Sequence, residues 1–317
     1  MSLYRERYFD FPVRHFHEKL REEHGIELSY SWVKAALQGA GLVGKRKQRG
    51  VHRKRRERRP LPGMLLHLDG SPHRWFQDDR WYDLLVVLDD ATSEIYYAQL
   101  VESESTRTVL EALKEVVEQR GIFCALYSDR ASHFFLTPKA GEEVDRGRLT
   151  QVGQALSQLG IDRIAAYSPQ ARGRGERNFQ TWQGRLPQEL RLRGLDTIEA
   201  ANRFLKRRYI REFNRKFAVA AAELGTALVP VGSVDLDRIF SIQQERVVNR
   251  DNTVSWENHC LQIEKTPWRS SLAGCRVAVY QHLDGEVTIG YGPHTVGCYT
   301  AEGVPIGKRL AGKQRVA

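Results

Sequence analysis

The pattern of apolar and polar residues divides the chain into three regions of different texture. The first 44 residues carry two apolar patterns with the 3.6-residue period of a helix, over residues 10–24 and 29–40. Residues 61–228 alternate short apolar runs with longer helical patterns, and residues 229–302 hold only short apolar runs. The pattern therefore predicts a helical segment, then a mixed α/β region, then a small β region.

Two helices joined by a short connection are predicted in residues 1–44. Asp10 and Pro12 favour the start of the first helix, and Gly25 favours its end. Ser29 favours the start of the second helix, whose apolar face leaves other side chains outward: Tyr30, Ser31, Trp32, Lys34 and Gln38. Such a pair is typical of a helix-turn-helix, whose second helix enters the DNA major groove; an ordinary helical pair is the alternative.

The α/β region, residues 61–228, has the element order of a ribonuclease-H-like fold. Three strands are predicted first, with short connections typical of an antiparallel meander, over residues 65–69, 82–90 and 94–100. Alternating helices and strands follow, at 105–120, 122–127, 149–159 and 161–166, with further helices from about 174 and 197. Pro187 is expected to kink or divide the helix that begins near residue 174. The fold class is therefore α/β, with a mixed five-stranded sheet.

Residues 229–302 are predicted to form a small SH3-like β-barrel. Short strands are expected at 247–248, 253–256, 260–263, 276–280 and 287–289. Asp284-Gly285 favours a hairpin turn between the last two strands. A basic tail, residues 303–317, ends the chain.

Positive charge is concentrated in one segment of the chain. The 317 residues carry a net charge of +10, and the segment from Lys45 to Arg59 alone carries +9. A localised basic block is typical of polyanion binding, although a solvated linker is the alternative. We predict that this linker, residues 45–60, contacts DNA through Lys45, Arg46, Lys47, Arg49, Arg53, Lys54, Arg55 and Arg56.

Composition argues against several other classes of protein. No apolar stretch approaches the roughly 20 residues that a membrane-spanning helix needs, and the N-terminus lacks the apolar core of a signal peptide. The 4 cysteines lie far apart without a C-x-x-C pair, which indicates free thiols in a reducing compartment. We therefore expect a cytoplasmic protein with no membrane partner.

Three acidic side chains fall where a catalytic metal ion could be held. Asp69 ends the first predicted strand, Asp129 follows the fourth, and Glu176 lies in the first turn of a later helix. In the predicted fold these strand ends are adjacent and the helix packs across them. Carboxylates brought together repel one another unless they hold cations, and two Mg²⁺ ions about 4 Å apart suit phosphodiester chemistry.

Other polar residues near these acids have competing interpretations. Asp89 and Asp90 also follow a strand, but Ala91-Thr92 predicts a turn that Asp90 caps. For His73 and His133 a structural or solvated role is favoured over contact with DNA or metal. The basic residues around Glu176 favour phosphate contact over plain surface charge: Arg172, Arg174 and Arg177.

Three sequence blocks carry a resemblance to a known family. Residues 68–76 (LDGSPHRWF), 126–130 (LYSDR) and 168–177 (SPQARGRGER) resemble the catalytic blocks of DDE transposases with an integrase core, closest to the ISNCY-type bacterial insertion-sequence transposases. Residues 87–92 (VLDDAT) also resemble the second strand of that core. The resemblance implies that Asp69, Asp129 and Glu176 are a catalytic triad that holds two Mg²⁺ ions, for which Mn²⁺ can substitute.

The resemblance also implies a function and partners. A bacterial enzyme of this family cleaves DNA at element ends and joins the 3′-hydroxyl to target DNA, which is DNA recombination and integration by transposition. Its partners are double-stranded DNA, both inverted-repeat ends and target, and further copies of itself, as a homodimer or higher oligomer. The alternative is a truncated, catalytically decayed relative that binds element ends without cutting. Gly175 motivates that alternative, because a glycine at the start of the helix of Glu176 weakens it by roughly 1 kcal/mol.

Overall fold

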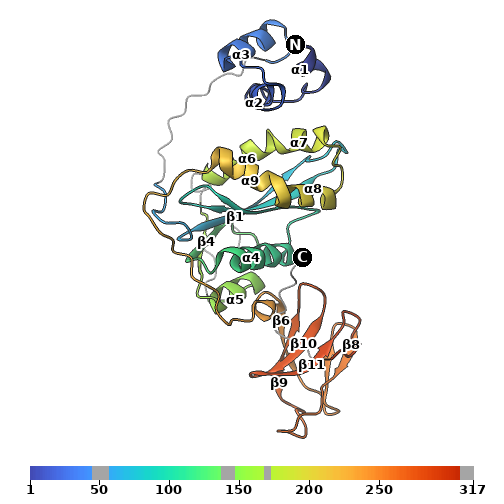
Figure 1. Ribbon diagram of the computed structural model, residues 1–317. Helices are drawn as coiled ribbons and strands as arrows, with labels where there is room; N and C mark the ends of the chain where they lie inside the picture. The colour runs from blue at the N-terminus through green and yellow to red at the C-terminus, as the bar shows by residue number, and fades with distance from the viewer. Residues whose placement is uncertain (45–56, 137–146, 168–172, 308–317) are drawn as a thin grey trace. The chain divides into compact units, whose positions relative to one another are not determined.

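The computed structural model describes residues 1–44, 57–136, 147–167 and 173–307 (Figure 1). The chain consists of two compact units. Unit 1 comprises Met1–Pro60, His67–Ser103 and Ser168–Ala222, and unit 2 comprises Leu61–Leu66, Glu104–Tyr167 and Glu223–Ala317. In the part of the chain that the structure describes, no helix combines the length and apolar character needed to cross a membrane.

The five-stranded sheet confirms the predicted ribonuclease-H-like fold class. Its strand order is β3-β2-β1-β4-β5, and β2–β3 pairs antiparallel whereas β4–β5 pairs parallel. The strands are β1 (Leu66–His73), β2 (Tyr82–Asp89), β3 (Ile95–Val101), β4 (Ala125–Ser128) and β5 (Asp162–Ala165). The paired strands β2 and β3 are almost fully buried, as their continuous apolar runs require.

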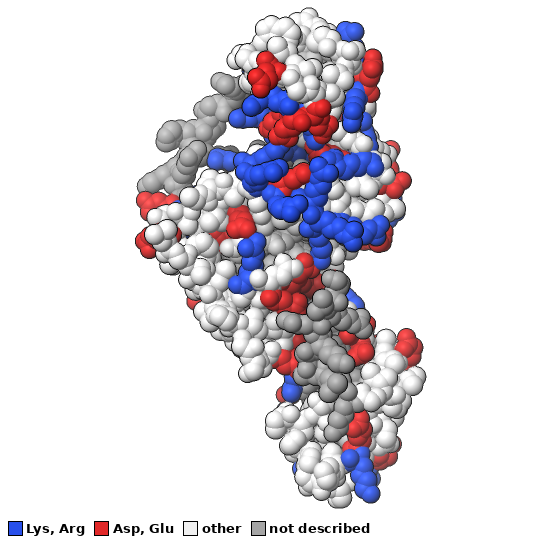
Figure 2. Space-filling view, in the orientation of Figure 1, with Lys and Arg blue, Asp and Glu red and all other residues white. Residues whose placement is uncertain are grey.

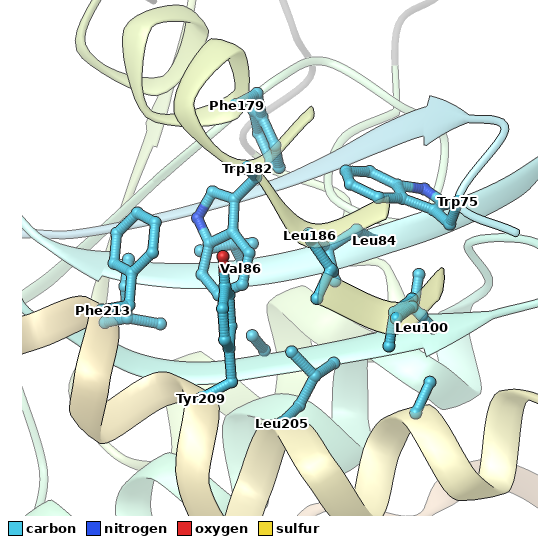
Figure 3. Close-up of a cluster of buried hydrophobic side chains, with 14 of the residues drawn as sticks. Trp75, Leu84, Val86, Leu100, Phe179, Trp182, Leu186, Leu205, Tyr209 and Phe213 are labelled. Atoms are coloured by element: carbon cyan, nitrogen blue, oxygen red, sulfur yellow. The ribbon is translucent and has the colours of Figure 1, made fainter. Parts of the chain in front are cut away.

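In unit 1, helices cover one face of the β1–β3 sheet. They are α6 (Gly173–Gln183), α7 (Leu186–Leu192), α8 (Ile198–Phe204), a π-helical turn (Leu205–Tyr209) and α9 (Ile210–Phe217). Their apolar side chains and those of β2 and β3 form one core, in which Trp182 stacks on Phe213 with ring centroids 4.4 Å apart (Figure 3). Pro187 lies in the first turn of α7, so the helix is divided there as predicted. The single helix predicted from residue 197 is instead three segments around a π turn.

The N-terminal helices α1 (Ser2–Glu6), α2 (Val13–His24) and α3 (Tyr30–Gly39) share an aromatic core of their own. Ser29 caps α3 by accepting from the backbone N–H of Trp32, and Gly25 ends α2 in a left-handed conformation, both as predicted. The prediction that Asp10 caps α2 is wrong, because Pro12 occupies the N-cap position. The carboxylate of Asp10 instead accepts two hydrogen bonds from the guanidinium of Arg191 on α7.

Ion pairs join α2 to α7. The buried carboxylate of Glu189 on α7 lies 2.7 Å from Nε2 of His15 and 2.8 Å from Nζ of Lys19. The guanidinium of Arg185 makes a bidentate pair with Glu18, at 2.7 Å for both nitrogens. Paired charges of both signs therefore fill an interface that apolar residues would otherwise have to fill.

Unit 2 contains the helices that flank β4 and β5. Helix α4 (Thr106–Arg120) begins at a capping box between Ser105 and Thr108 and ends at Gly121, where the backbone φ is +101°. Its predicted apolar face is buried: Val109, Leu110, Leu113, Val116 and Val117. Helix α5 (Gln151–Gln158) is capped by Thr150. Both helices occupy the ranges that their 3.6-residue patterns predict.

The C-terminal part of unit 2 is a small β domain. A short helix, α10 (Leu236–Ile239), precedes β6 (Ile242–Val247), β7 (Thr253–Trp256), β8 (His259–Gln262), β9 (Arg276–Gln281), β10 (Val287–Tyr291) and β11 (His294–Tyr299). The sheet order is β11-β10-β9-β6, with β7–β8 as a separate hairpin, and both contribute to a single core. The predicted turn joins β9 to β10, with Gly285 at φ +93°.

Candidate active site

Asp69 lies inside β1, not at its end as predicted. The strand continues through Gly70 and Ser71 to His73, because these residues keep the extended conformation. Leu66, His67 and Leu68 before it are buried, whereas Asp69 is half-buried. The carboxylate is therefore held on a rigid strand at the border of the core and the solvent.

Helix α6 lies near β1 at both of its ends. A Cβ atom built on Gly175 would lie 3.5 Å from Oδ2 of Asp69, so the first turn of α6 lies close to this carboxylate. Further along the helix, Nε2 of Gln183 donates to Oγ of Ser71 at 2.9 Å. These two contacts, near either end of α6, fix the helix along β1.

Glu176 follows Gly175 and is exposed in the first turn of α6. The helix is anchored by its apolar stripe, in which Phe179 and Trp182 are buried, as the sequence predicts (Figure 3). The stripe continues into α7 through Leu186 and Leu190. Since Glu176 makes no part of this core, its side chain can change rotamer without disturbing the packing.

Asp129 directly follows β4, at the predicted position. The side chain is half-buried, and its Oδ1 accepts from the backbone N–H of Ala131 at 2.9 Å. A carboxylate that bonds to a backbone N–H two residues further on belongs to a tight turn of the chain. Asp129 therefore has a defined orientation at the end of its strand.

The three acids offer the oxygen ligands that Mg²⁺ prefers. Two of their positions, Asp69 and the helical turn of Glu176, meet within unit 1. Among the residues that the structure describes, no three or more His, Cys, Asp or Glu side chains are grouped closely enough to hold a metal ion. The donor set therefore suits the metal by its chemistry.

The acids that follow β2 have structural roles, but not the one predicted. Oδ1 of Asp89, not Asp90, caps the turn by accepting from the backbone N–H and the hydroxyl of Thr92, both at 2.9 Å. Asp90 is fully buried, 2.7 Å from Nε2 of His67, and it accepts from the backbone N–H of Arg59 at 2.8 Å. The pair of Asp90 and His67 fastens the end of β2 to β1.

The two histidines near the acids also have structural contacts. His133 lies 2.7 Å from the carboxylate of Glu104, within unit 2. His73 packs edge-on against Trp75, and burial lowers the pKa of its imidazole. These contacts support the structural interpretation for both side chains.

Some of the predicted DNA-binding residues are exposed. Tyr30, Ser31 and Lys34 lie on the outer face of α3, where Trp32 is 57% exposed, and Arg177 is exposed on α6. Arg174 belongs to α6, but its side chain is not described. The remaining predicted contacts fall outside the described residues: Lys45, Arg46, Lys47, Arg49, Arg53, Lys54, Arg55, Arg56 and Arg172.

Comparisons with known proteins identify two relatives by sequence. The chain is 35% identical over 301 residues to "Putative transposase y4bF" of Sinorhizobium fredii, which covers 93% of this chain and 65% of the relative. It is 28% identical over 281 residues to "Transposase for insertion sequence IS1202" of Streptococcus pneumoniae, covering 78% of this chain and 60% of the relative. Both relatives are named as transposases. The chain spans less than two thirds of the length of either one.

No family model matches the chain. Among solved structures, a chain of the simian T-cell lymphotropic virus intasome in complex with PP2A regulatory subunit B56 gamma aligns with 13% identity and a TM-score of 0.39, over 90% of this chain and 94% of that one. The HTLV-2 integrase catalytic core domain in complex with magnesium aligns with 16% identity and a TM-score of 0.33, over 47% of this chain and 90% of that one.

Proposed function

We propose that the chain acts as an insertion-sequence transposase of the ISNCY type, which cuts DNA at element ends and joins the 3′-hydroxyl to target DNA. The similarity to two transposases supports this proposal. The observation that carries it is the closeness of Gly175 to Asp69: a Cβ added to this glycine would lie 3.5 Å from Oδ2 of the acid on the central strand, and Glu176 is the next residue. A ribonuclease-H-like sheet with an acid on β1 and another after β4 suits that chemistry.

In this proposal Asp69, Asp129 and Glu176 act together as metal ligands. The side chain of Glu176 is exposed in the first turn of α6, so it is free of core packing and available as a ligand. Mg²⁺, as two ions and replaceable by Mn²⁺, supplies Lewis-acid stabilisation of negative charge on the phosphate oxygens when bound. The carboxylates orient the site and need not transfer protons.

Other residues of the chain would position the DNA. Helix α3 presents Tyr30, Ser31 and Lys34 to the solvent, which suits a recognition helix in a major groove. Arg177, one residue after Glu176, is exposed and suits a phosphate next to the reacting one. The basic linker, residues 45–60, adds affinity that does not depend on base sequence.

Strand transfer in vitro tests the proposal. The substrate is duplex DNA that carries the inverted repeats flanking the reading frame, incubated with the protein, target plasmid and Mg²⁺ or Mn²⁺. We expect D69N, D129N and E176Q each to lower the rate by about 10³-fold or more, since several kcal/mol of transition-state stabilisation is lost, while DNA affinity is retained.

Asp79 supplies a matched control for these variants. It is exposed, follows β1 in the chain and pairs only with the exposed Arg74 among the contacts described. D79N should therefore transfer strands at the rate of the wild type. A wild-type protein that binds the ends and yet neither nicks nor joins them with either metal would contradict the proposal and favour the decayed relative.

The proposal includes an assembly of several copies on DNA. Joining both ends of an element requires that they are held together, so we expect a homodimer or higher oligomer when end DNA is present. Light scattering coupled to gel filtration, with and without an end duplex, measures the mass of the complex. A complex of one protein copy with one duplex at saturating DNA would argue against this part of the proposal.

A further inference from the structure

Arginines form a row along the outer side of the α8–α9 segment. We define the arginine row as Arg203 on α8, Arg207 in the π turn, and Arg211 and Arg215 on α9. All four side chains are exposed. Figure 2 shows Lys and Arg side chains gathered over the part of the molecule where Figure 1 places α7–α9.

The π turn explains why these arginines line up. In a regular α-helix, a residue four positions on is rotated about 40° past the first, so a row with this spacing winds around the helix. A π turn holds an extra residue, as the hydrogen bond from the Ile210 N–H to the Leu205 carbonyl shows. The wider turn takes up this excess rotation, so Arg203, Arg207 and Arg211 stay on one side.

The buried positions of the same segment give an independent check on this alignment. Ala201, Leu205, Tyr209 and Phe213 are also spaced by four, and all are buried in the core with α6. Each arginine of the row lies two positions after one of these residues, which is about half a turn away. The row therefore faces away from the core along its whole length.

The charges of the row are not neutralised locally. No Asp or Glu oxygen of the described residues lies within ion-pair distance of Arg203, Arg207, Arg211 or Arg215, although neighbouring Arg208 pairs with Glu212. Like charges four residues apart destabilise a helix by a few tenths of a kcal/mol per pair. The row thus lowers the stability of its own helix, and no ion pair among the described residues offsets this cost.

We propose that the arginine row binds the phosphate backbone of duplex DNA without reading its sequence. The inference rests on the proposed function, because a transposase would meet DNA as its polyanionic partner. A straight row of guanidinium groups suits a partner whose negative charges repeat along a line, and arginine pairs well with phosphate. The segment packs on α6 through Trp182 and Phe213, so DNA on the row lies on the unit that carries Asp69 and Glu176.

The salt dependence of binding tests this inference directly. Anisotropy of a labelled 30-bp duplex of arbitrary sequence, in EDTA, gives Kd for the full chain between 50 and 200 mM salt. Each phosphate contact contributes about 0.9 to the slope of log K against log salt. We expect the combined variant R203Q/R207Q/R211Q to lower the slope by about 2–3 and to weaken binding at least tenfold at 0.1 M salt.

Two further variants control for charge and for folding. R80Q/R107Q/R276Q removes the same net charge from arginines that pair with Glu102, Glu111 and Glu245, and its slope should stay within about 0.5 of the wild type. R203K/R207K/R211K keeps the charge and should retain the slope. Thermal melts of all three establish that each one is folded.

A slope of R203Q/R207Q/R211Q equal to that of the wild type overturns the inference. So does an equal loss in R80Q/R107Q/R276Q, because net charge alone would then be responsible. If R203Q/R207Q/R211Q loses affinity for vesicles of anionic lipid and keeps it for DNA, the row serves a membrane surface and the inference is wrong. Because binding is measured without metal or element ends, a protein that fails to transfer strands leaves this result untouched.

Discussion

At the scale of single residues, Gly175 affects both the stability of α6 and the surroundings of Asp69 in the candidate site. An added Cβ would lie 3.5 Å from Oδ2 of Asp69, which is an ordinary contact, and the helical backbone there accepts any L-residue. We expect G175A to stabilise the protein by up to about 1 kcal/mol, because alanine loses less backbone entropy in a helix. Urea denaturation measures this change.

The same substitution at Gly121 provides the contrast. Gly121 ends α4 with φ +101°, and a Cβ there would lie 2.6 Å from the carbonyl oxygen of Val229. We expect G121A to destabilise the protein by more than about 1 kcal/mol, since both the backbone conformation and the space exclude a side chain. Equal effects of G175A and G121A in the same denaturation series would contradict this account of both glycines.

Single residues also show where reasoning from the sequence stops. The positions of Asp129 directly after β4 and of Glu176 in the first turn of α6 were predicted correctly, since both elements have a clear apolar pattern. The choice between Asp89 and Asp90 was wrong, because His67 on β1 pairs with Asp90, while Asp89 accepts the hydrogen bonds that cap the turn. That contact joins residues 23 positions apart, and local turn preferences contain no information about it.

At the scale of elements, the ion pairs between α2 and α7 depend on one buried carboxylate. Glu189 contacts His15, Lys19 and Arg193, and it is almost completely buried. We expect E189Q to destabilise the protein by about 3 kcal/mol, because the buried ammonium of Lys19 loses its buried carboxylate partner and keeps only the half-buried Glu23. Chemical denaturation measures this loss.

E245Q is the control. The exposed ion pair of Glu245 with Arg276 should contribute less than about 1 kcal/mol to stability. A similar loss of stability in E189Q and E245Q would rule out the special role of burial.

The same contact predicts a loss of stability in acid. Burial lowers the pKa of the His15 imidazole, and Glu189 opposes this effect only in part. Below the ordinary histidine pKa of 6.5, His15 therefore binds more protons in the unfolded chain than in the folded one. Burial alone would raise the pKa of Glu189, but His15 and Lys19 outweigh it and hold this pKa below the ordinary 4.5. Both shifts have the same sign: stability falls as the pH drops below about 6.5, and falls further below about 4.5.

Hydrogen exchange of α2 between pH 8 and pH 4 measures this dependence, after correction for the intrinsic exchange rate. We expect protection of α2 and α7 to decrease as the pH falls, while α4, which makes none of these contacts, changes less. H15N should remove the part of the dependence between pH 7 and pH 5. Constant protection of α2 from pH 7 to pH 5 would show that protonation of His15 is not coupled to the stability of α2.

Element length explains which parts of the fold the sequence predicts. The long amphipathic helix α4 was predicted over residues 105–120, because its apolar pattern is long and Ser105 and Gly121 suit its two ends. The short elements α1, α10 and β11 have four to six residues each and were missed, since so few positions give no period. The π turn within α8–α9 was also missed, because it changes the spacing by one residue and leaves the apolar pattern almost intact.

At the scale of the whole molecule, the net charge of +10 comes mainly from the basic linker, residues 45–60. Outside the linker the chain has nearly balanced charge, yet the arginine row forms a basic surface there, because no acidic side chain of the described residues pairs with it. The sequence identified the linker because its charges are contiguous. The arginine row was not predicted from the sequence, because its members are four residues apart and the π turn that aligns them was not predicted either.

These two basic segments predict additive contributions to DNA binding. If linker and row contact different phosphates, each releases its own counterions, and their contributions to the salt slope add. Replacing Lys45, Arg46, Lys47 and Arg49 by Gln should lower the slope by about 3, and combining this change with R203Q/R207Q/R211Q should lower it by about 5–6. The measurement is the anisotropy titration with the same 30-bp duplex. A combined variant no weaker than the linker variant alone would mean that both segments compete for the same phosphates, whereas a loss larger than the sum would mean that one segment delivers the DNA to the other.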